Sequence, residues 1–566
     1  MTGRPSLVRP LPDAIADAVR PGMALHFALG QARPNAAIRV LMRQFAGTRP
    51  GFSLSATGFG GPQLGLFLVA AGLADRLVTG FVGHQYPSPG PDRRTNRLID
   101  DGVVRIEAWS LLTFLQRLRA AALGVEWFTT GSLTGSSIPR GSPDIRDAGG
   151  ATLVRALRPD VTFLHGVVAD AEGNTVLSVP AGEGISGAAA ARDGAIVTVE
   201  EVVSTDQVRA AAAGATVLPG ALVRAVCPVR FGAHPSGVYA PDAFRSYSYG
   251  DDYAFIQESA QALALPDDAL ASWIDDRLLA APSEATIAHL LAWRDWGAET
   301  PVAVDHPAVP TGEEVSAAVA ARIIRDLALG PDAPAFVLTG IGVSSLAAWL
   351  ARHGDDAFPP LVSEVGLYDY TPSPGNPFLF YYPNLTSCVG LTDTDAILGT
   401  LVQGQGSRSL GVLAAGQLDR DGNINSTRTD SGWLTGSGGA NDIASGSRRN
   451  VVLVPHRRGR LVERVDFVTS PGRNVTVVVT DRAVLERHGP DLVLTGVVTA
   501  DPSALGSVVR DVLAATPWDV PVAPSVRALP PPDPGELDVL RSYDPQRHLL
   551  GSRPAVALAA MTGASS

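Results

Sequence analysis

The chain of 566 residues contains no lysine, so each of its 45 basic residues is an arginine. This absence excludes every chemistry that needs a lysine amine, including pyridoxal or Schiff-base catalysis and the Walker A phosphate loop. A site that binds phosphate groups must instead use arginine, backbone N–H groups or water. An arginine-only composition is typical of a GC-rich genome, so we expect a bacterial source.

Cysteine and long apolar runs are also scarce. The two cysteines, Cys227 and Cys388, are too few for a disulfide framework and fit a reducing compartment. The longest apolar run, at 64–74, is shorter than the ~18–20 residues that span a bilayer. The opening sequence MTGRPSLVRP lacks the apolar stretch of a signal peptide. We therefore expect a cytoplasmic protein without a membrane-spanning segment.

Charged residues make up 18% of the chain and hydrophobic residues 45%, which is typical of a globular protein. The net charge of −11 disfavours nucleic acid as a partner, because a nucleic-acid binder needs a basic face. The sequence contains no H-E-x-x-H, no C-x-x-C and no closely spaced His/Asp pair with ligand geometry, so it predicts no metal site. A G-x-S-x-G nucleophile elbow is also missing, which leaves a serine hydrolase without support.

The length alone predicts two to four domains. A proline-rich stretch predicts a linker at 301–310, which separates halves of residues 1–300 and 311–566. Thr311 and Glu314 have the spacing of a capping box, so a helix is expected to begin just after the linker.

The two halves share a short pattern. Each contains an apolar run followed by Asp-x-x-Gly-Asn, which ends at Asn174 in the first half and at Asn423 in the second. Locally the pattern is typical of a strand and a tight turn, because glycine and asparagine tolerate positive φ. Its recurrence predicts two related α/β units. In the second half, a strand at 335–339, a helix at 344–353 and a strand ending at Ser363 predict a β-α-β unit in a parallel sheet.

The turn between that first strand and the helix is one candidate site. Gly340 and Gly342 match the opening of the G-x-G-x-x-G dinucleotide fingerprint, and Glu364 lies near where a ribose-binding acid would follow. Ser345 occupies the third glycine position, which weakens a nicotinamide interpretation.

A glycine-rich loop is the second candidate site. Gly436, Ser437, Gly438 and Gly439 precede a helix expected at 440–444. Such a loop directs several backbone N–H groups to one place, which suits a phosphate group or a developing oxyanion. The alternative is a flexible turn that binds no ligand.

Glu364 itself is the third candidate, because it directly follows the short apolar strand that ends at Ser363. Parallel sheets bind their ligands at the carboxyl ends of the strands. A partly desolvated carboxylate there suits a general base or a nucleophile, and Gly366 would let another group approach the backbone closely. The alternative is a surface or helix-capping glutamate.

Four stretches of the second half, in order and at family-like spacing, resemble the β subunit of family I CoA-transferases of the glutaconate type. They are SEVG (363–366), LAAGQLDRDGNINST (413–427), GSGGANDIA (436–444) and LVERVDFVTSPG (461–472). Three stretches of the first half look like the matching α subunit. They are PDVTFLHGVVADAEGN (159–174), GAIVTVEEVVS (194–204) and CPVRFGAHPSGVY (227–239). The chain therefore resembles an α–β fusion over nearly its whole length.

The resemblance implies two similar open parallel-sheet α/β domains in tandem, with the active site between them. It implies that CoA moves from an acyl-CoA to a carboxylic acid by a ping-pong route, with Glu364 forming first a mixed anhydride and then a glutamyl-CoA thioester. The implied CoA- and oxyanion-binding loop is Gly436, Ser437, Gly438, Gly439, Ala440 and Asn441, with Gly340, Gly342 and Gly366 in supporting turns. The CoA thioester is a substrate, so no permanently bound cofactor is implied. We expect small-molecule partners and a homodimer or larger homo-oligomer.

Two other functions remain open. Glu107 lies in a region where one branch of the same superfamily, hydrolases that open rings of CoA thioesters, has a catalytic glutamate. Its ordinary alternative is a strand-end or helix-capping carboxylate. A non-catalytic sensor of CoA esters on the same fold is the other function. The aromatic stretch at 366–384 is expected either to line the acyl pocket or to pack in the core.

Overall fold

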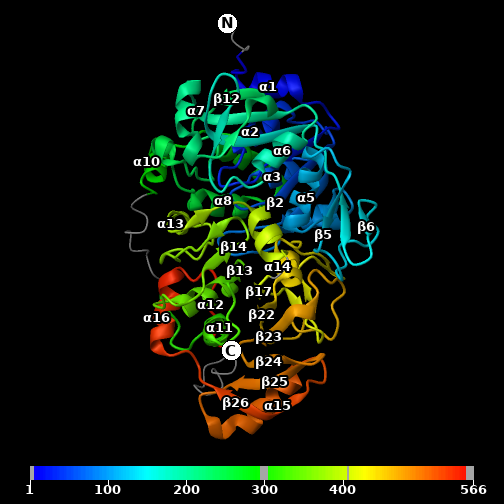
Figure 1. Cartoon of the computed structure of the whole chain (residues 1–566), viewed down its shortest axis with the longest axis vertical. Coiled ribbons are helices and arrows are strands. Elements are labelled where there is room, and N and C mark those ends of the chain that lie inside the picture. Colours follow the sequence, from blue (N-terminus) through cyan, green and yellow to red (C-terminus); the bar gives the residue numbers. More distant parts are fainter. Residues whose placement is uncertain (1–5, 294–303, 405–406, 556–566) are drawn as a thin grey trace.

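The computed structural model describes residues 6–293, 304–404 and 407–555. Two β-sheets flanked by helices follow one another along the long axis of the molecule, with the N-terminal sheet at the top of Figure 1 and the C-terminal sheet below it. The prediction of two α/β units in tandem is therefore confirmed. The predicted linker at 301–310 lies partly outside the described residues, and the domain boundaries stay a prediction.

Within the described part of the chain, the first sheet has nine strands in the order β11-β9-β8-β1-β2-β3-β4, with β10 beside β8 and β12 beside β10. Their bounds are β1 (Ala24–Phe27), β2 (Phe52–Phe59), β3 (Ala74–Val82), β4 (Arg105–Ala108), β8 (Val161–Ala169), β9 (Thr175–Leu177), β10 (Ala195–Val202), β11 (Val217–Leu218) and β12 (Val223–Pro228). The central pairings are parallel, while β9 pairs antiparallel with β8 and β11. Every residue of β8 is buried, which explains why its sequence is a nearly continuous apolar run.

Helices and a small sheet surround this first sheet. The helices are α1 (Leu11–Ala18), α2 (Asn35–Gln44), α3 (Gly65–Ala70), α4 (Arg93–Asp100), α5 (Leu111–Ala122), α6 (Gly184–Ala190), α7 (Thr205–Ala211), α8 (Tyr253–Ala262), α9 (Asp267–Trp273) and α10 (Glu284–Leu291). The small sheet contains β5 (Trp127–Thr130), β6 (Ile145–Asp147) and β7 (Thr152–Arg155).

The second sheet has ten strands among the described residues, in the order β16-β15-β14-β13-β17-β22-β23-β24-β25-β26. Their bounds are β13 (Phe336–Thr339), β14 (Leu361–Ser363), β15 (Leu367–Tyr368), β16 (Gly390–Leu391), β17 (Ser409–Ala414), β22 (Arg449–Leu453), β23 (Val475–Val479), β24 (Ala483–His488), β25 (Asp491–Val498) and β26 (Val522–Leu529). The run from β14 to β23 is parallel, as predicted, and antiparallel strands extend it on both sides. The sheet is therefore mixed rather than purely parallel.

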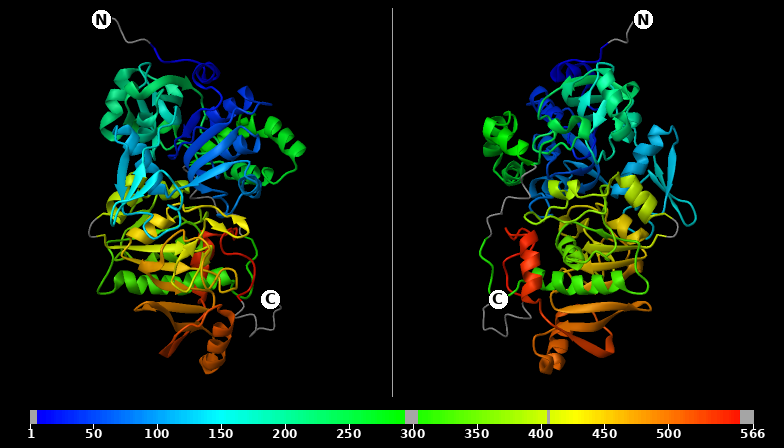
Figure 2. Two further views of the ribbon diagram at one scale, coloured as in Figure 1. Left: turned by 90° about the vertical axis from the view of Figure 1, so that its right-hand side faces the viewer. Right: turned by 60° about the vertical axis from the view of Figure 1, so that its left-hand side comes forward.

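The remaining elements complete the second half. The helices are α11 (Gly312–Leu329), α12 (Val343–Arg352), α13 (Tyr382–Thr386), α14 (Ala440–Gly446), α15 (Leu505–Ala515) and α16 (Pro534–Tyr543). Two hairpins pair β18 (Gln417–Leu418) with β19 (Ile424–Asn425), and β20 (Arg428–Thr429) with β21 (Gly432–Trp433). Figure 2 shows α11 lying along the second sheet, with β24, β25, β26 and α15 at the lower end of the molecule.

The local predictions agree with the structure. β13, α12 and β14 form the expected β-α-β unit, and the two strands pair in parallel. Thr311 caps α11 through a capping box, because its hydroxyl accepts the Glu314 N–H and the Glu314 carboxylate accepts the Thr311 N–H. No helix in the described residues is long and apolar enough to cross a membrane.

Candidate active site

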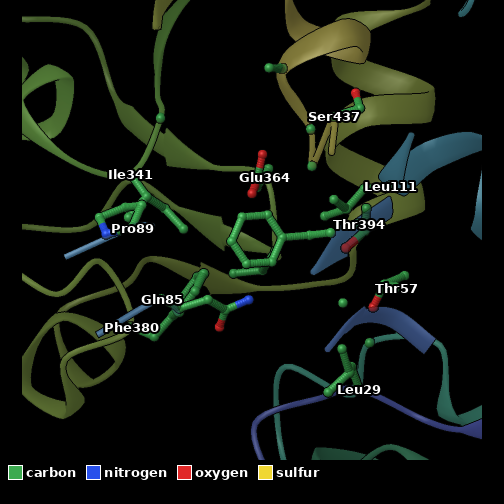
Figure 3. Close-up of a pocket in the computed structure, with 18 of the residues that line it drawn as sticks. Leu29, Thr57, Gln85, Pro89, Leu111, Ile341, Glu364, Phe380, Thr394 and Ser437 are labelled. Atoms are coloured by element: carbon green, nitrogen blue, oxygen red, sulfur yellow. The ribbon is translucent and has the colours of Figure 1, made fainter. Parts of the chain in front are cut away.

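A pocket of about 220 Å³ opens between the two halves of the chain. In Figure 3, Glu364 and Ser437 of the second half lie on one side of it, and Thr57 and Leu29 of the first half lie opposite. Residues of both halves therefore line the pocket. This is where the resemblance places the active site.

Glu364 lies immediately after β14, at the carboxyl end of a parallel strand. Its side chain is only 9% exposed, and no hydrogen bond to its carboxylate is found among the described residues. Burial, with a smaller contribution from the nearby charge of Asp442, raises the pKa of Glu364 to about 7. The strand thus positions the carboxylate while its surroundings remove its water.

The glycine loop lies directly against Glu364. A Cβ added at Gly439 would be 1.9 Å from Oε2 of Glu364, so only glycine permits the observed packing. The Gly438 N–H donates to the carbonyl of Gly80 at 2.9 Å, so it is not available to a ligand. No hydrogen bond from the Gly439 N–H is found among the described residues. Within the loop, the Gly438 N–H therefore cannot serve as an oxyanion donor, whereas the Gly439 N–H remains a proposed one.

The other predicted loop residues divide into two groups. Gly436, Ser437 and Ala440 line the pocket, whereas Asn441 does not. The Asn441 amide accepts the Leu133 N–H at 2.9 Å and donates to the Thr469 carbonyl at 2.8 Å, so it holds the backbone around the loop.

Asp442 was not identified from the sequence, although it follows the predicted loop directly. It is buried in α14 and accepts hydrogen bonds from the Ser110 hydroxyl (2.6 Å) and the Leu112 N–H (3.0 Å) at the start of α5. Burial raises the pKa of Asp442 to about 6, and these hydrogen bonds oppose that shift. Asp442 therefore joins the helix behind the loop to the first half and adds its charge to the field at Glu364.

The backbone of the loop also joins the two halves. The Val82 N–H donates to the Thr435 carbonyl at 2.7 Å, and the Leu111 N–H donates to the Gly438 carbonyl at 3.0 Å. Together with the bond from Gly438 to Gly80, these contacts place the loop at the ends of β3 and α5. The geometry of the second-half loop is therefore set largely by the first half.

The three glycines expected in supporting turns have different roles. Gly340 lines the pocket, and Gly342 has φ +111° as the residue that precedes α12. Gly366 has φ +109°, and a Cβ there would be 2.4 Å from the carbonyl oxygen of Thr392. The close approach expected at Gly366 is thus made by the chain itself. Gly366 itself does not line the pocket.

Glu107 does not line the pocket. It lies on β4 and forms ion pairs with Arg76 and, at 3.8 Å, with Arg117. A hydrolase that uses Glu107 together with Glu364 therefore has no geometric support. In the aromatic stretch at 366–384, Leu367 and Phe380 line the pocket, while most of the other aromatic residues pack in the core.

A second buried carboxylate in the pocket, Glu183, was missed. It sits between Gly182 and Gly184, just before α6, and Thr57 donates two hydrogen bonds to it. Burial raises the pKa of Glu183 to about 7, which backbone N–H groups and Thr57 partly oppose. The glycine on each side of Glu183 is a local pattern that could have marked it, whereas Glu364 was found because it directly follows a strand. Among the described residues, no group of three or more His, Cys, Asp or Glu side chains has an arrangement that would hold a metal ion.

Residues 10–228 match the family model described as Coenzyme A transferase. The chain is 32% identical over 221 residues to the A subunit of the 3-oxoadipate CoA-transferase of Pseudomonas knackmussii, which covers 37% of this chain and 72% of that relative. It is 32% identical over 152 residues to the B subunit of the glutaconate CoA-transferase of Acidaminococcus fermentans, which covers 24% of this chain and 56% of that relative. The structure of an acyl-CoA transferase (YdiF) from Escherichia coli O157:H7 covers 98% of both chains with a TM-score of 0.64 and 15% identity.

The chain belongs to the coenzyme A transferase family. It is an enzyme that transfers CoA between an acyl-CoA and a carboxylic acid, and its matches to both kinds of subunit fit a fusion of the two in one chain. The likeness to the E. coli structure shows that the fold is shared along the whole chain.

Proposed function

We propose that Glu364 is the nucleophile of this CoA-transferase and carries CoA as a glutamyl thioester between the two half-reactions. One observation supports the proposal above all. A buried carboxylate without a hydrogen-bond partner among the described residues lies at the end of β14, against the backbone of Gly439, in the pocket between the halves.

The proposed steps balance without any added reactant. A Glu364 carboxylate oxygen attacks the thioester carbonyl carbon, the C–S bond breaks, and a mixed anhydride and CoA thiolate form. The thiolate then attacks the Glu364 carbonyl carbon, which releases the first acid as a carboxylate and leaves CoA on the enzyme. A second carboxylate reverses both steps, and water takes no part.

The surroundings of Glu364 support this role. A carboxylate is a weak nucleophile in water, and burial in an apolar pocket removes the hydration that weakens it. With a pKa of about 7, a large share of Glu364 is ionised at neutral pH. The backbone of Gly439 packs against the carboxylate, and its N–H is the donor we assign to the tetrahedral oxyanion.

We also propose small organic acids as substrates, since the relatives are named for 3-oxoadipate and glutaconate. A cytoplasmic location is proposed because cysteine is scarce in the sequence. We also propose a bacterial source, which the arginine-only composition supports. We further propose a homo-oligomeric assembly and no permanently bound cofactor.

The test is mass spectrometry of the intact protein and its peptides after incubation with a panel of acyl-CoAs, with borohydride trapping. We expect a CoA adduct, or a reduced side chain, on the peptide that contains Glu364. Glu364→Gln should show neither, once slow deamidation back to glutamate has been excluded by mass. Glu201→Gln, an exposed glutamate on β10, is the matched control and should label like the wild type. Turnover without any mark on the Glu364 peptide would refute the assignment.

A further inference from the structure

The first-half wall of the pocket carries a polar cluster that the transfer steps do not use. Glu183, Thr57 and Arg33 all line the pocket. The Thr57 N–H (3.3 Å) and hydroxyl (3.0 Å) both donate to Oε1 of Glu183. Both Thr57 donors meet Oε1, while the backbone N–H groups of Leu29 and Glu183 lie near enough to the carboxylate to lower its pKa. We assign Oε2 as the oxygen that meets a ligand.

Arg33, on the same side of the pocket, has N–H groups that are not used in hydrogen bonds within the described ranges. Its Nη1 donates to the carbonyls of Gly30 and Gln31, and no hydrogen bond from Nε or Nη2 is found within the described ranges. The guanidinium feels the charges of Glu183 and Asp251, yet it forms no ion pair within 4.0 Å with either. The gap between the Arg33 nitrogens and the Glu183 carboxylate oxygens is therefore wider than 4.0 Å.

The charges around this space favour a neutral polar group. Asp251 lies outside the pocket lining, accepts the Gly237 N–H at 2.8 Å, and offsets the charge of Arg33. A ligand with a further negative charge would lie uncompensated beside Glu183. A hydroxyl is neutral, and it can donate to a carboxylate and accept from a guanidinium at the same time.

We propose that Glu183, Thr57 and Arg33 form the acyl-recognition subsite and that it takes an acyl group bearing a hydroxyl, which donates to Glu183 and accepts from Arg33. The inference rests on the proposed function, because the acyl group must reach Glu364 in the same pocket. Figure 3 places Thr57 across the pocket from Glu364, so an acyl chain that extends away from the thioester would meet this wall.

The proton on Glu183 then controls the choice of acyl group. Above a pH of about 7 the free oxygen accepts a hydrogen bond, which suits a hydroxyl. Below that pH the proton sits on Oε2, because Oε1 already accepts both Thr57 donors, and the group becomes a donor that suits a carbonyl. As the pH falls, kcat/KM for an oxoacyl-CoA should therefore rise relative to kcat/KM for the matching hydroxyacyl-CoA.

Other charged groups face this wall. Burial lowers the pKa of Arg33, but an arginine stays protonated over this pH range. Asp251 and, across the pocket, Asp442 have pKa values of about 6. His26, which lies against α6, has its pKa lowered to about 4 by burial and stays neutral. Glu364 titrates near 7 in the same range, but its ionisation affects every acyl-CoA alike. A ratio of two substrates at each pH removes that common effect.

The experiment compares kcat/KM for butyryl-CoA, 3-hydroxybutyryl-CoA, acetoacetyl-CoA and succinyl-CoA, with acetate as the common acceptor, at pH 6 and pH 8.5. Matched five- and six-carbon sets cover the case in which the four-carbon chain is too short. At pH 8.5 we expect kcat/KM for the hydroxyacyl-CoA to exceed that for its unsubstituted analogue by about 10²-fold or more. Without the hydroxyl, Glu183 and Arg33 would lack a hydrogen-bond partner on the substrate. The ratio of hydroxyacyl to oxoacyl should fall about tenfold or more on going to pH 6.

Glu183→Gln is the decisive variant, with Glu201→Gln as its control. The amide oxygen must face the two Thr57 donors, so the amide nitrogen faces the pocket and can only donate. This variant should prefer the oxoacyl-CoA at both pH values and lose the pH dependence of the ratio. Arg33→Gln should weaken selection for either oxygen substituent.

Three results would overturn the subsite. They are equal rates for all four thioesters in wild type, a clear preference for succinyl-CoA, and an unchanged ratio in Glu183→Gln. Failure of the proposed function looks different, because no acyl-CoA would then leave an adduct on the Glu364 peptide. Adduct formation without discrimination among acyl groups rejects the subsite alone.

Discussion

Replacing Gly439 with alanine should abolish transfer without unfolding the enzyme. The new Cβ would be 1.9 Å from Oε2 and 2.9 Å from Cδ of Glu364, whereas ordinary contacts begin near 3.4 Å. The carboxylate must therefore move by about 1.5 Å, which is the difference between 3.4 and 1.9 Å. A misplacement of ~1 Å can cost roughly 10²-fold in rate, so we expect kcat to fall at least about 10²-fold.

Gly438→Ala is the matched comparison one residue away. A Cβ there would be 3.8 Å from Leu111 and would touch nothing in the site, but φ is +52°. Alanine in this left-handed conformation costs about 1 kcal/mol of stability, with little effect on the position of Glu364. Gly214→Ala, where a Cβ would have no atom within 4 Å, serves as the neutral control.

The assay is CoA exchange between a labelled acid and its acyl-CoA, with thermal unfolding of each variant measured in parallel. We expect Gly439→Ala to lose exchange and keep its fold, and Gly438→Ala to keep most exchange and melt slightly earlier. Wild-type kinetics in Gly439→Ala, or equal losses in the two variants, would refute the packing argument.

Three further predictions concern the carboxylates. Glu364→Asp withdraws the nucleophile by about 1.5 Å, so it should lose exchange while gaining thioester hydrolysis, and Glu364→Gln should do neither; equal behaviour of the two variants in both assays would contradict the idea that water fills the vacated space. Glu364→Gln should raise the free energy of unfolding at pH 8 by about 3 kcal/mol, because the raised pKa of Glu364 makes its ionised form destabilising as the pH rises from 4.5 to about 7. Denaturant titrations should show this stabilisation at pH 8 and not at pH 4.5. A stabilisation that is the same at both pH values would count against the prediction. Glu107→Gln should leave exchange within about threefold of wild type in steady-state assays, since Glu107 pairs with Arg76 outside the pocket; loss of activity there, with Glu364→Gln active, would favour a hydrolase.

The sequence was sufficient to find Glu364 because the relevant signal is local. A short apolar run followed at once by a carboxylate fixes a side chain at the end of a strand, whatever the rest of the chain does. The glycine loop before α14 and the capping box of α11 are local in the same sense. The tandem fold followed from the Asp-x-x-Gly-Asn pattern that both halves share and from the alternation of strands and helices in the second half.

The features that could not be predicted depend on distant partners. The hydrogen bond from Ser110 to Asp442 joins residues 332 positions apart, and no local pattern indicates it. The same holds for Gly438, because its N–H donates to the carbonyl of Gly80, which lies far away in the sequence. Glu183 has a glycine on each side, but its partner Thr57 lies on β2, 126 positions earlier, and no local pattern indicates that the two meet in the pocket.

The backbone bonds between the loop and the ends of β3 and α5 bear on how a bulky thioester enters. A wedge-like opening of the two halves would break the bonds at Val82, Gly438 and Leu111, and would pull Asp442 from the start of α5. Each turnover would then have to rebuild the oxyanion donor before any chemistry. We therefore expect the halves to stay closed through the catalytic cycle. Both acids and CoA would then enter and leave the pocket through the same permanently open entrance. The rate-limiting step would be the chemistry or a local loop motion.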